Sequence, residues 1–213
     1  MSIADQLVSI KSKLPETVTL VAVSKTKPNT DILAAYTAGQ RVFGENKVQE
    51  LVKKQEELPK DIQWHMIGHL QRNKVKFIAP FITLIHAVDN LKLLQEIDKR
   101  AAQNNRKIDC LLQVHIAKED TKFGFGIHEI TQVLLTTSSF KNISIIGLMG
   151  MATFTDDNNQ IKEEFKSLKT VFDSIKNDKI TILSMGMSGD YPLAIEQGST
   201  MVRVGSAIFG HRN

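Results

Sequence analysis

The chain of 213 residues has a single cysteine, Cys110, together with one tryptophan and two tyrosines. One thiol cannot build a disulfide framework or a metal site with several thiolate ligands. No run of about 18 apolar residues occurs, so no transmembrane helix is expected. The first residues, Met1–Asp5, have neither a basic start nor an apolar block, so no signal peptide is expected. These absences predict a protein without a membrane anchor in a reducing compartment, most simply the cytoplasm.

The excess of positive charge is small, because 27 basic and 23 acidic residues give a formal net charge of +4. Where lysines are densest, between Lys47 and Lys60, the acids Glu50, Glu56 and Glu57 are interleaved with them. This mixture is typical of a solvent-exposed helix face. Few tryptophan and tyrosine rings are available for base stacking. A nucleic-acid partner is therefore not expected.

Apolar runs rich in β-branched residues recur along the chain, and most are continuous, which favours buried parallel strands. They lie at residues 18–23, 41–44, 62–68, 81–88, 108–116, 143–151, 180–187 and 201–204. Amphipathic segments before and between them predict helices. These segments are 3–14, 31–39, 46–58, 90–104 and 155–176, the last of them starting at Asp156 or Asp157.

Strands alternating with helices predict one α/β domain over residues 1–213. The sheet is either an open doubly wound sheet or a closed barrel, and eight repeating units favour the (β/α)8 TIM barrel. No Gly-x-Gly-x-x-Gly turn follows the first strand, which argues against a dinucleotide-binding sheet. The sequence has no heptad stripe, so a monomer is expected. In either architecture, the chemistry belongs just after the carboxyl ends of the strands.

A lysine at the end of the first strand is the candidate nucleophile. Lys25 closely follows the apolar run 18–23, and Lys27 lies two residues on, the spacing of one strand face. Burial and a neighbouring cation both lower the pKa of a lysine, and the resulting amine is suited to a Schiff base with an aldehyde. The alternative is a lysine that extends from the strand end into solvent.

Two loops of small residues follow the seventh and eighth strands. The first contains Ser188-Gly189-Asp190 and the second contains Gly205-Ser206. In barrels, the loops after strands seven and eight frequently bind phosphate through backbone amides and hydroxyl groups. Ordinary turn chemistry, with Ser188 or Asp190 capping the next helix, is the alternative.

Arg203 lies inside the last apolar run. Because a guanidinium stays protonated in proteins, its buried charge needs a partner. An ion pair with a strand-end acid such as Glu45 is one solution, and a ligand ring nitrogen or phosphate is another.

The histidines are less informative. His65 and His69 have a spacing that suits zinc on a helix, but Gly68 and the β-like composition argue against a helix there. No metal site is expected, and the remaining candidates are interpreted as core or loop histidines: His86, His115 and His128.

Several segments together resemble the pyridoxal phosphate homeostasis protein family, whose members look like a stand-alone N-terminal barrel of alanine racemase. These segments are Val23–Pro28, Phe43–Asn46, Trp64–Gln71, Ser184–Asp190 and Gly198–Gly210. They run in order from the first strand to the last, so the resemblance covers the whole chain and its motifs are specific.

The resemblance implies that pyridoxal 5′-phosphate (PLP) is held as a Schiff base on Lys25. It further implies phosphate contacts from Ser188, Gly205 and Ser206, with Thr200 as an additional contact. Arg203 is implied to face the pyridine nitrogen or the phosphate. Residues implied to lie near the ring are Asn46, His65 and Met187. Lys47 stands where many relatives have tyrosine, so an aromatic contact is not expected there, and Lys122 is a candidate secondary or transfer site.

The function that the resemblance implies is intracellular homeostasis of PLP (vitamin B6) and amino acids. The protein is expected to hold PLP and to deliver it to PLP-dependent apoenzymes, without catalytic turnover. A PLP-dependent racemase or lyase of low activity is the first alternative. Racemisation needs proton removal on one face and delivery on the other, and Tyr36 and Tyr191 fall within or at the start of helices. A class I aldolase-type barrel is the second alternative, although its lysine usually belongs to a later strand.

Overall fold

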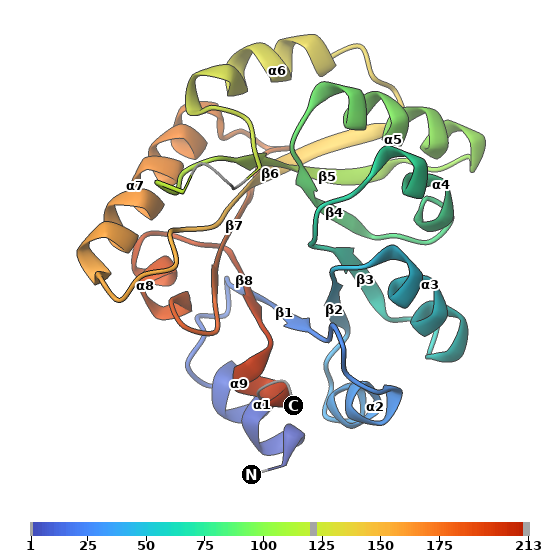
Figure 1. The fold of residues 1–213 in the computed structure, drawn as a ribbon, viewed down its shortest axis with the longest axis vertical. Helices are drawn as coiled ribbons and strands as arrows, with labels where there is room; N and C mark the ends of the chain where they lie inside the picture. Colours follow the sequence, from blue (N-terminus) through green and yellow to red (C-terminus); the bar gives the residue numbers. More distant parts are fainter. Residues whose placement is uncertain (1, 120–122, 211–213) are drawn as a thin grey trace.

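The computed structural model describes residues 2–119 and 123–210. Its strands form one closed parallel barrel in the order β1 to β8, and β1 pairs with β8. Helices surround the strands, which form the centre of the molecule (Figure 1). The predicted TIM barrel is therefore confirmed, and the open sheet is excluded. Closure also places the ends of the first and last strands side by side, which positions the candidate site.

All eight strands occur where the apolar runs predict them, with ends that differ by a few residues. Their bounds are β1 Thr19–Val23, β2 Val42–Glu45, β3 Gln63–Met66, β4 Leu84–Val88, β5 Ile108–Val114, β6 Ile143–Gly150, β7 Ile182–Met187 and β8 Met201–Val204. Continuous apolar runs suit these strands because helices cover the outside of the barrel and side chains fill its inside.

The expected helices are present, and two more were missed. The α-helices are α1 Ile3–Lys11, α2 Asn29–Thr37, α3 Val48–Glu57, α4 Val75–Ile78, α5 Leu91–Gln103, α6 Ile130–Thr137, α7 Asn158–Ile175, α8 Tyr191–Glu196 and α9 Ser206–Phe209, with short 3-10 segments η1 Arg72–Lys74 and η2 Ile127–Glu129. Asp157 caps α7, since its side chain accepts from the amides of Asn159 and Gln160. The missed helices are α4, which is a single turn, and α6, which has no charged residue to mark a polar face.

The core has two parts, as the two faces of each strand require. The larger part lies between the strands and the helices, where Phe43 and Trp64 pack with ring centroids 6.0 Å apart. The smaller part fills the barrel interior and consists of Val21, Leu84, Ala87, Leu111, Met149 and Met201. Side chains that alternate with these apolar ones therefore point outwards, a rule that the site below follows closely.

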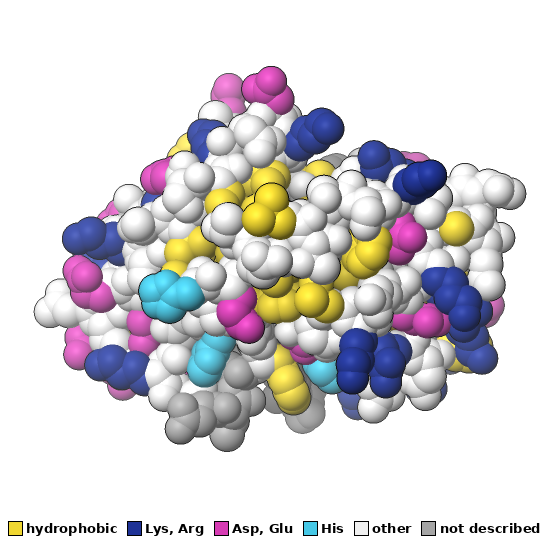
Figure 2. All heavy atoms as spheres, turned by 90° about the horizontal axis from the view of Figure 1, so that it is seen from above, with side chains coloured by type: hydrophobic (Ala, Val, Ile, Leu, Met, Phe, Trp, Pro, Cys, Tyr) yellow, Lys and Arg dark blue, Asp and Glu magenta, His cyan; other side chains and the backbone are white. Residues whose placement is uncertain are grey.

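Apolar side chains are exposed on the face of the molecule around α6 (Figure 2). Seen from the side of α6, hydrophobic side chains gather near the middle of the face, with charged side chains nearer its edges (Figure 2). Leu135 of α6 is 64% exposed. Within residues 2–119 and 123–210, no helix combines the length and apolar content needed to cross a membrane.

Candidate ligand-binding site

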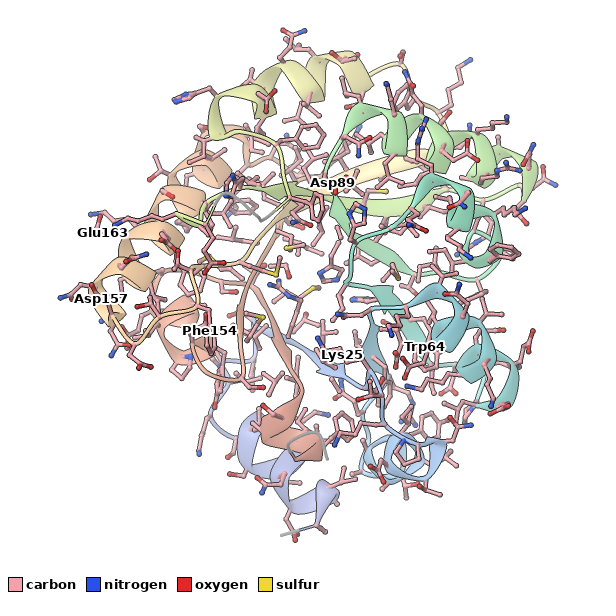
Figure 3. All side chains as sticks on the ribbon, viewed as in Figure 1. Lys25, Trp64, Asp89, Phe154, Asp157 and Glu163 are labelled. Carbon is pink, nitrogen blue, oxygen red and sulfur yellow. The ribbon has the colours of Figure 1, made fainter. Side chains whose placement is uncertain are left out.

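A cavity of about 1050 Å³ opens at the carboxyl ends of the strands. This volume is at the upper end of the range for small-molecule sites. Its walls come from the ends of β1, β6, β7 and β8 and the loops that follow them, together with Asn46 after β2 and Ile67 after β3. Lys25 lies near the middle of the barrel opening, whereas Asp157 and Glu163 lie at the outer edge of the molecule, beside α7 (Figure 3).

Most of the residues predicted to bind a ligand line this one cavity. They are Lys25, Asn46, Met187, Ser188, Arg203, Gly205 and Ser206. These residues are far apart in sequence, and barrel closure brings them together because the strands are parallel and end at the same face. Lys27 also lines the cavity, and its Nζ donates to the carbonyl of Phe209 at 2.8 Å.

Two predicted residues do not reach the cavity wall. Thr200 lies before β8, at the end of the barrel opposite Gly205, where its Oγ1 accepts from the amide of Leu183 at 2.8 Å. The expected ligand contact from Thr200 is therefore wrong. Thr200 is close to Gly205 in sequence, but the length of β8 separates it from the cavity. His65 lies deeper inside the barrel, on β3, and is 4% exposed.

Lys25 reaches the cavity because of strand alternation. Val21 belongs to the interior cluster, and Val23 and Lys25 continue this inward face to the cavity wall. Ser24 points the opposite way and is buried, with its hydroxyl donating to Oε1 of Glu45 at 2.6 Å. Thr26 then turns the chain with a positive φ of 64°, an uncommon conformation for a β-branched residue.

The loops after β7 and β8 meet at the cavity. The amide of Gly205 donates to Oγ of Ser188 at 3.1 Å. A Cβ at Gly205 would lie only 3.1 Å from the carbonyl oxygen of Val23, so a glycine suits this close approach to β1. Asp190 does not cap α8 through its side chain, which accepts instead from the amide of Met187 at 2.5 Å. The helix-capping alternative therefore does not hold for Asp190.

Arg203 has backbone and hydroxyl partners, and the suggested ion pair with Glu45 does not form. Its Nη1 donates to the carbonyl and the hydroxyl of Ser184 at 3.0 and 2.6 Å, and its Nη2 donates to the carbonyl of Gly150 at 3.0 Å. Burial lowers the pKa of Arg203 to about 10, while the charge of Asp190 acts in the opposite direction. The guanidinium therefore remains charged at neutral pH and borders the cavity.

A chain of buried polar groups continues from Arg203 across the barrel interior. Oγ of Ser184 lies 3.2 Å from Nδ1 of His86, and Nε2 of His86 lies 3.0 Å from Nδ1 of His65. Burial lowers the pKa of His65 to about 3, and burial, His65 and Arg203 lower that of His86 well below its ordinary range. Both rings are thus neutral. The sequence indicated core histidines but gave no signal of this chain, because its members come from four different strands.

A second missed feature lies outside the barrel, between β1, β2 and α3. Nζ of Lys54 lies 2.8 Å from Oε1 of Glu45 and 2.6 Å from Oε1 of Glu50. The side chain of Lys54 is only 6% exposed, so the expectation of a solvated face over the charge run is wrong at this position. The signal was available: Lys54 falls at helical spacing in the buried stripe of Val48 and Leu51.

The wall opposite Lys25 is the loop between β6 and α7, which the sequence did not single out. Glu164, buried on α7, accepts from the amide and the hydroxyl of Thr153 at 2.6 and 2.8 Å. The next residue, Phe154, is 96% exposed at the cavity rim, and its amide donates to Oε1 of Glu119 at 2.9 Å. This loop is therefore held by buried and interloop hydrogen bonds.

The remaining candidates lie elsewhere. His69 pairs with Asp89 at 2.9 Å and stacks on Phe123, away from His65. Among residues 2–119 and 123–210, no group of three or more His, Cys, Asp or Glu is arranged to hold a metal ion. Lys47 is exposed at the start of α3, and Lys122 lies outside the described residues.

Comparison with known proteins places the chain in a family. The family model described as alanine racemase, N-terminal domain, matches residues 1–213. The pyridoxal phosphate homeostasis protein of Aquifex aeolicus is 39% identical over 197 residues, which cover 91% of this chain and 86% of that protein. The protein of the same name from Synechocystis is 41% identical over 208 residues, with 95% of each chain covered.

Solved structures agree with this placement. The structure of PipY from Synechococcus elongatus without PLP has a TM-score of 0.93 and 37% identity, and the match covers 98% of this chain and 100% of that one. The structure of PipY with PLP bound has a TM-score of 0.90 and 38% identity, with the same coverage. Alanine racemase from E. faecalis, at 16% identity and a TM-score of 0.78, shares the fold, and the match covers 99% of this chain and 58% of that one. The chain therefore belongs to the pyridoxal phosphate homeostasis protein family, which is built on the barrel of the alanine racemase N-terminal domain.

Proposed function

We propose that this protein binds PLP in the cavity, holds it as a Schiff base on Lys25 and serves in PLP homeostasis. The observation that carries the proposal is the meeting of three elements on one wall. Lys25 at the end of β1 lies beside the loops after β7 and β8, which are joined by the hydrogen bond from Gly205 to Ser188. The relatives named for PLP homeostasis and the PLP-bound PipY structure support the choice of ligand.

The groups present fit the chemistry of PLP. PLP supplies an aldehyde, which condenses with a primary amine to give an imine and water, and a phosphate, which needs hydrogen-bond donors and positive charge. Lys25 provides the amine, and the hydroxyl groups of Ser188 and Ser206 provide donors for the phosphate, while Gly205 keeps the loop between them free of a side chain. Because the Ser188 hydroxyl already accepts from Gly205, its own proton can be donated to a phosphate oxygen. Lys27 adds a second cation at the same wall.

Arg203 completes the wall with a fixed positive charge. Its three hydrogen bonds to Ser184 and Gly150 hold the guanidinium in one orientation, so it presents its charge to the cavity without moving. Either a ring nitrogen or a phosphate oxygen of the ligand can accept from it. Asn46 and Met187 border the remaining space where a ring would lie. These are the residues we propose for the PLP site, and Thr200 is not among them.

We further propose that the protein holds PLP without catalytic turnover. Racemisation requires a proton-transfer group on each face of the reacting carbon. Within the described ranges the cavity wall carries no histidine or tyrosine, and Tyr36 is directed to Asp61 at 2.8 Å, away from the site. The wall also carries Lys27, Asp156 and Asp190, of which Lys27 donates to the Phe209 carbonyl and Asp190 accepts from the Met187 amide. The open mouth suits release to a second protein. PLP-dependent apoenzymes as recipients, a monomeric state and a cytoplasmic location belong to the same proposal.

Borohydride reduction in the presence of PLP, followed by peptide mass mapping, tests the site. The expected result is phosphopyridoxyl mass on the peptide that contains Lys25. Lys25→Ala is expected to abolish this adduct and to keep the wild-type melting temperature, because removing a half-buried lysine from a strand end leaves no large cavity. The matched control is Lys176→Ala, which removes an exposed lysine from the end of α7.

Adducts scattered over surface lysines in wild type and Lys25→Ala alike would contradict the proposed site. The test of function is a separate experiment and uses PLP-loaded protein that has not been reduced. Mixed with an excess of an apo-aminotransferase, it is expected to restore that enzyme's activity. Steady turnover of an amino acid by the loaded protein alone would instead favour the racemase or lyase alternative.

A further inference from the structure

The residues before and after Lys25 are both held from the helix side of the barrel. The hydroxyl of Ser24 donates to Oε1 of Glu45 at 2.6 Å, and its carbonyl accepts from Nζ of Lys54 at 2.8 Å. The amide of Thr26 donates to Oε1 of Glu50 at 2.6 Å. Each neighbour of Lys25 in the chain is therefore fixed by a charged side chain.

These three side chains also bind one another, and we call Glu45, Glu50 and Lys54 the β1 clamp. Nζ of Lys54 contacts Oε1 of both carboxylates, at 2.8 and 2.6 Å. The side chains of Glu45 and Lys54 are 0% and 6% exposed. Lys54 thereby connects the contact before Lys25 to the contact after it, and neither contact can shift independently of the other.

Stability alone is a poor explanation for the clamp. Removing two carboxylates and an ammonium from water carries a desolvation penalty that can exceed their attraction. The clamp shows this penalty: Oε2 of Glu45 is buried without a hydrogen-bond partner, and burial raises the pKa of this carboxyl despite the opposing effects of Lys54 and Ser24. Apolar side chains of similar size would fill the same space between β2 and α3 without that cost.

The strained backbone beside Lys25 indicates what the clamp stabilises. Thr26 has a φ of 64°, a conformation that costs a residue with a Cβ about 1 kcal/mol or more. This turn ends the strand with Ser24 facing outwards and Lys25 facing the cavity. Without the bond from Thr26 to Glu50, the turn is free to relax, and the direction in which Lys25 leaves the strand is no longer fixed.

We propose that the β1 clamp consists of positioning residues that orient Lys25 for reaction with a carbonyl ligand. The inference rests on the proposed function of Lys25 and adds a role for Glu45, Glu50 and Lys54. None of the three lines the cavity, so their influence on a ligand passes through the backbone of Ser24 and Thr26. Imine formation requires the amine to approach the carbonyl carbon closely, and small misplacements reduce such reactions strongly.

The test compares Glu50→Ala with Glu50→Gln, using full-length protein and PLP. Glu50→Ala removes the acceptor for the Thr26 amide. Glu50→Gln keeps an oxygen that can accept the same bond. We expect Glu50→Ala to weaken imine formation, measured by absorbance, by about tenfold or more, equivalent to about 1.4 kcal/mol. Glu50→Gln is expected to stay within about threefold of wild type. Glu56→Ala is the matched control, because Glu56 is exposed on the same helix.

Two further readouts separate positioning from stability and from the proposed function. Amide hydrogen exchange at Thr26 is expected to be faster in Glu50→Ala than in Glu50→Gln, while melting temperatures verify that both variants fold. Wild-type imine formation and wild-type Thr26 exchange in a folded Glu50→Ala protein would overturn the clamp. If Glu50→Ala does not fold, Glu50→Gln alone tests the clamp. In that variant, imine formation weakened more than tenfold while Thr26 still exchanges slowly would overturn the proposal. If wild type forms no imine at Lys25, the proposed function fails, and the exchange comparison still judges the clamp.

Discussion

Arg203 donates from Nη1 to the hydroxyl of Ser184 at 2.6 Å, and this bond sets the direction of a hydrogen-bond chain through the barrel. An arginine cannot accept, so the Ser184 hydroxyl must direct its own proton to Nδ1 of His86. His86 is then protonated at Nε2, which donates to Nδ1 of His65. The charge at the cavity wall thus fixes the tautomer of two buried histidines.

Ser184→Ala is expected to lower the free energy of unfolding by about 1–3 kcal/mol, because His86 and Arg203 each lose a buried partner. Arg203→Gln is expected to weaken PLP retention, because it removes the charge at the cavity wall. A double-mutant cycle of the two, measured by urea unfolding, should give a coupling energy of about 0.5–3 kcal/mol. Ser174→Ala, at an exposed serine of α7, serves as the control. Additive effects of the two substitutions would contradict the directed chain.

The neutral state of the two histidines predicts a pH dependence. In the folded protein burial lowers the pKa of His65 to about 3 and that of His86 well below 6.5, whereas unfolding restores ordinary values near 6.5. Below pH 6.5 the unfolded state therefore takes up protons that the folded state does not bind. The stabilising contribution is complete above pH 6.5 and is lost as the pH falls towards 3, by about 1.4 kcal/mol per pH unit for each histidine.

Urea unfolding between pH 7 and pH 4 measures this slope. His65→Asn should reduce it by about 1.4 kcal/mol per pH unit, since one of the two buried rings is absent. His128→Asn, at an exposed position before α6, should leave the slope unchanged. Equal slopes in wild type and His65→Asn would show that the ring is protonated in the folded state as well.

The sequence predicted elements and loop contacts better than it predicted side-chain partners. The strands follow from continuous apolar runs, and Lys25 and Gly205 follow from their places just after strand ends, because parallel strands carry such residues to one face. Thr200 shows the limit of this reasoning: nearness to Gly205 in sequence places it across the length of a strand from the site. Lys54 shows another limit, because a charge run does not reveal which lysine lies on the buried stripe.

Gly147 is expected to be intolerant of any side chain. It lies opposite Ile182 where β6 pairs with β7, and a Cβ there would approach the Ile182 carbonyl oxygen to 1.8 Å. Because the obstacle is backbone, Gly147→Ala should lower the free energy of unfolding by about 3 kcal/mol or more. Gly189→Ala is the matched control: a Cβ there would meet nothing within 4 Å, so stability should change by less than about 0.5 kcal/mol. Thermal unfolding that is the same in both variants would contradict the predicted backbone collision.

Thr200 and Ser206 flank β8 at its opposite ends, and their substitutions should have opposite consequences. Thr200→Val keeps the shape but leaves the Leu183 amide without its acceptor, so stability should fall by about 1–3 kcal/mol while PLP affinity stays unchanged. Ser206→Ala removes an exposed hydroxyl from the cavity wall, so stability should hold within about 0.5 kcal/mol. Its loss of a hydrogen bond to a charged phosphate should weaken PLP binding by about tenfold or more. Urea unfolding and PLP titration of both variants provide the comparison. The reverse pattern, with affinity lost in Thr200→Val and kept in Ser206→Ala, would move the phosphate site to the other end of the barrel.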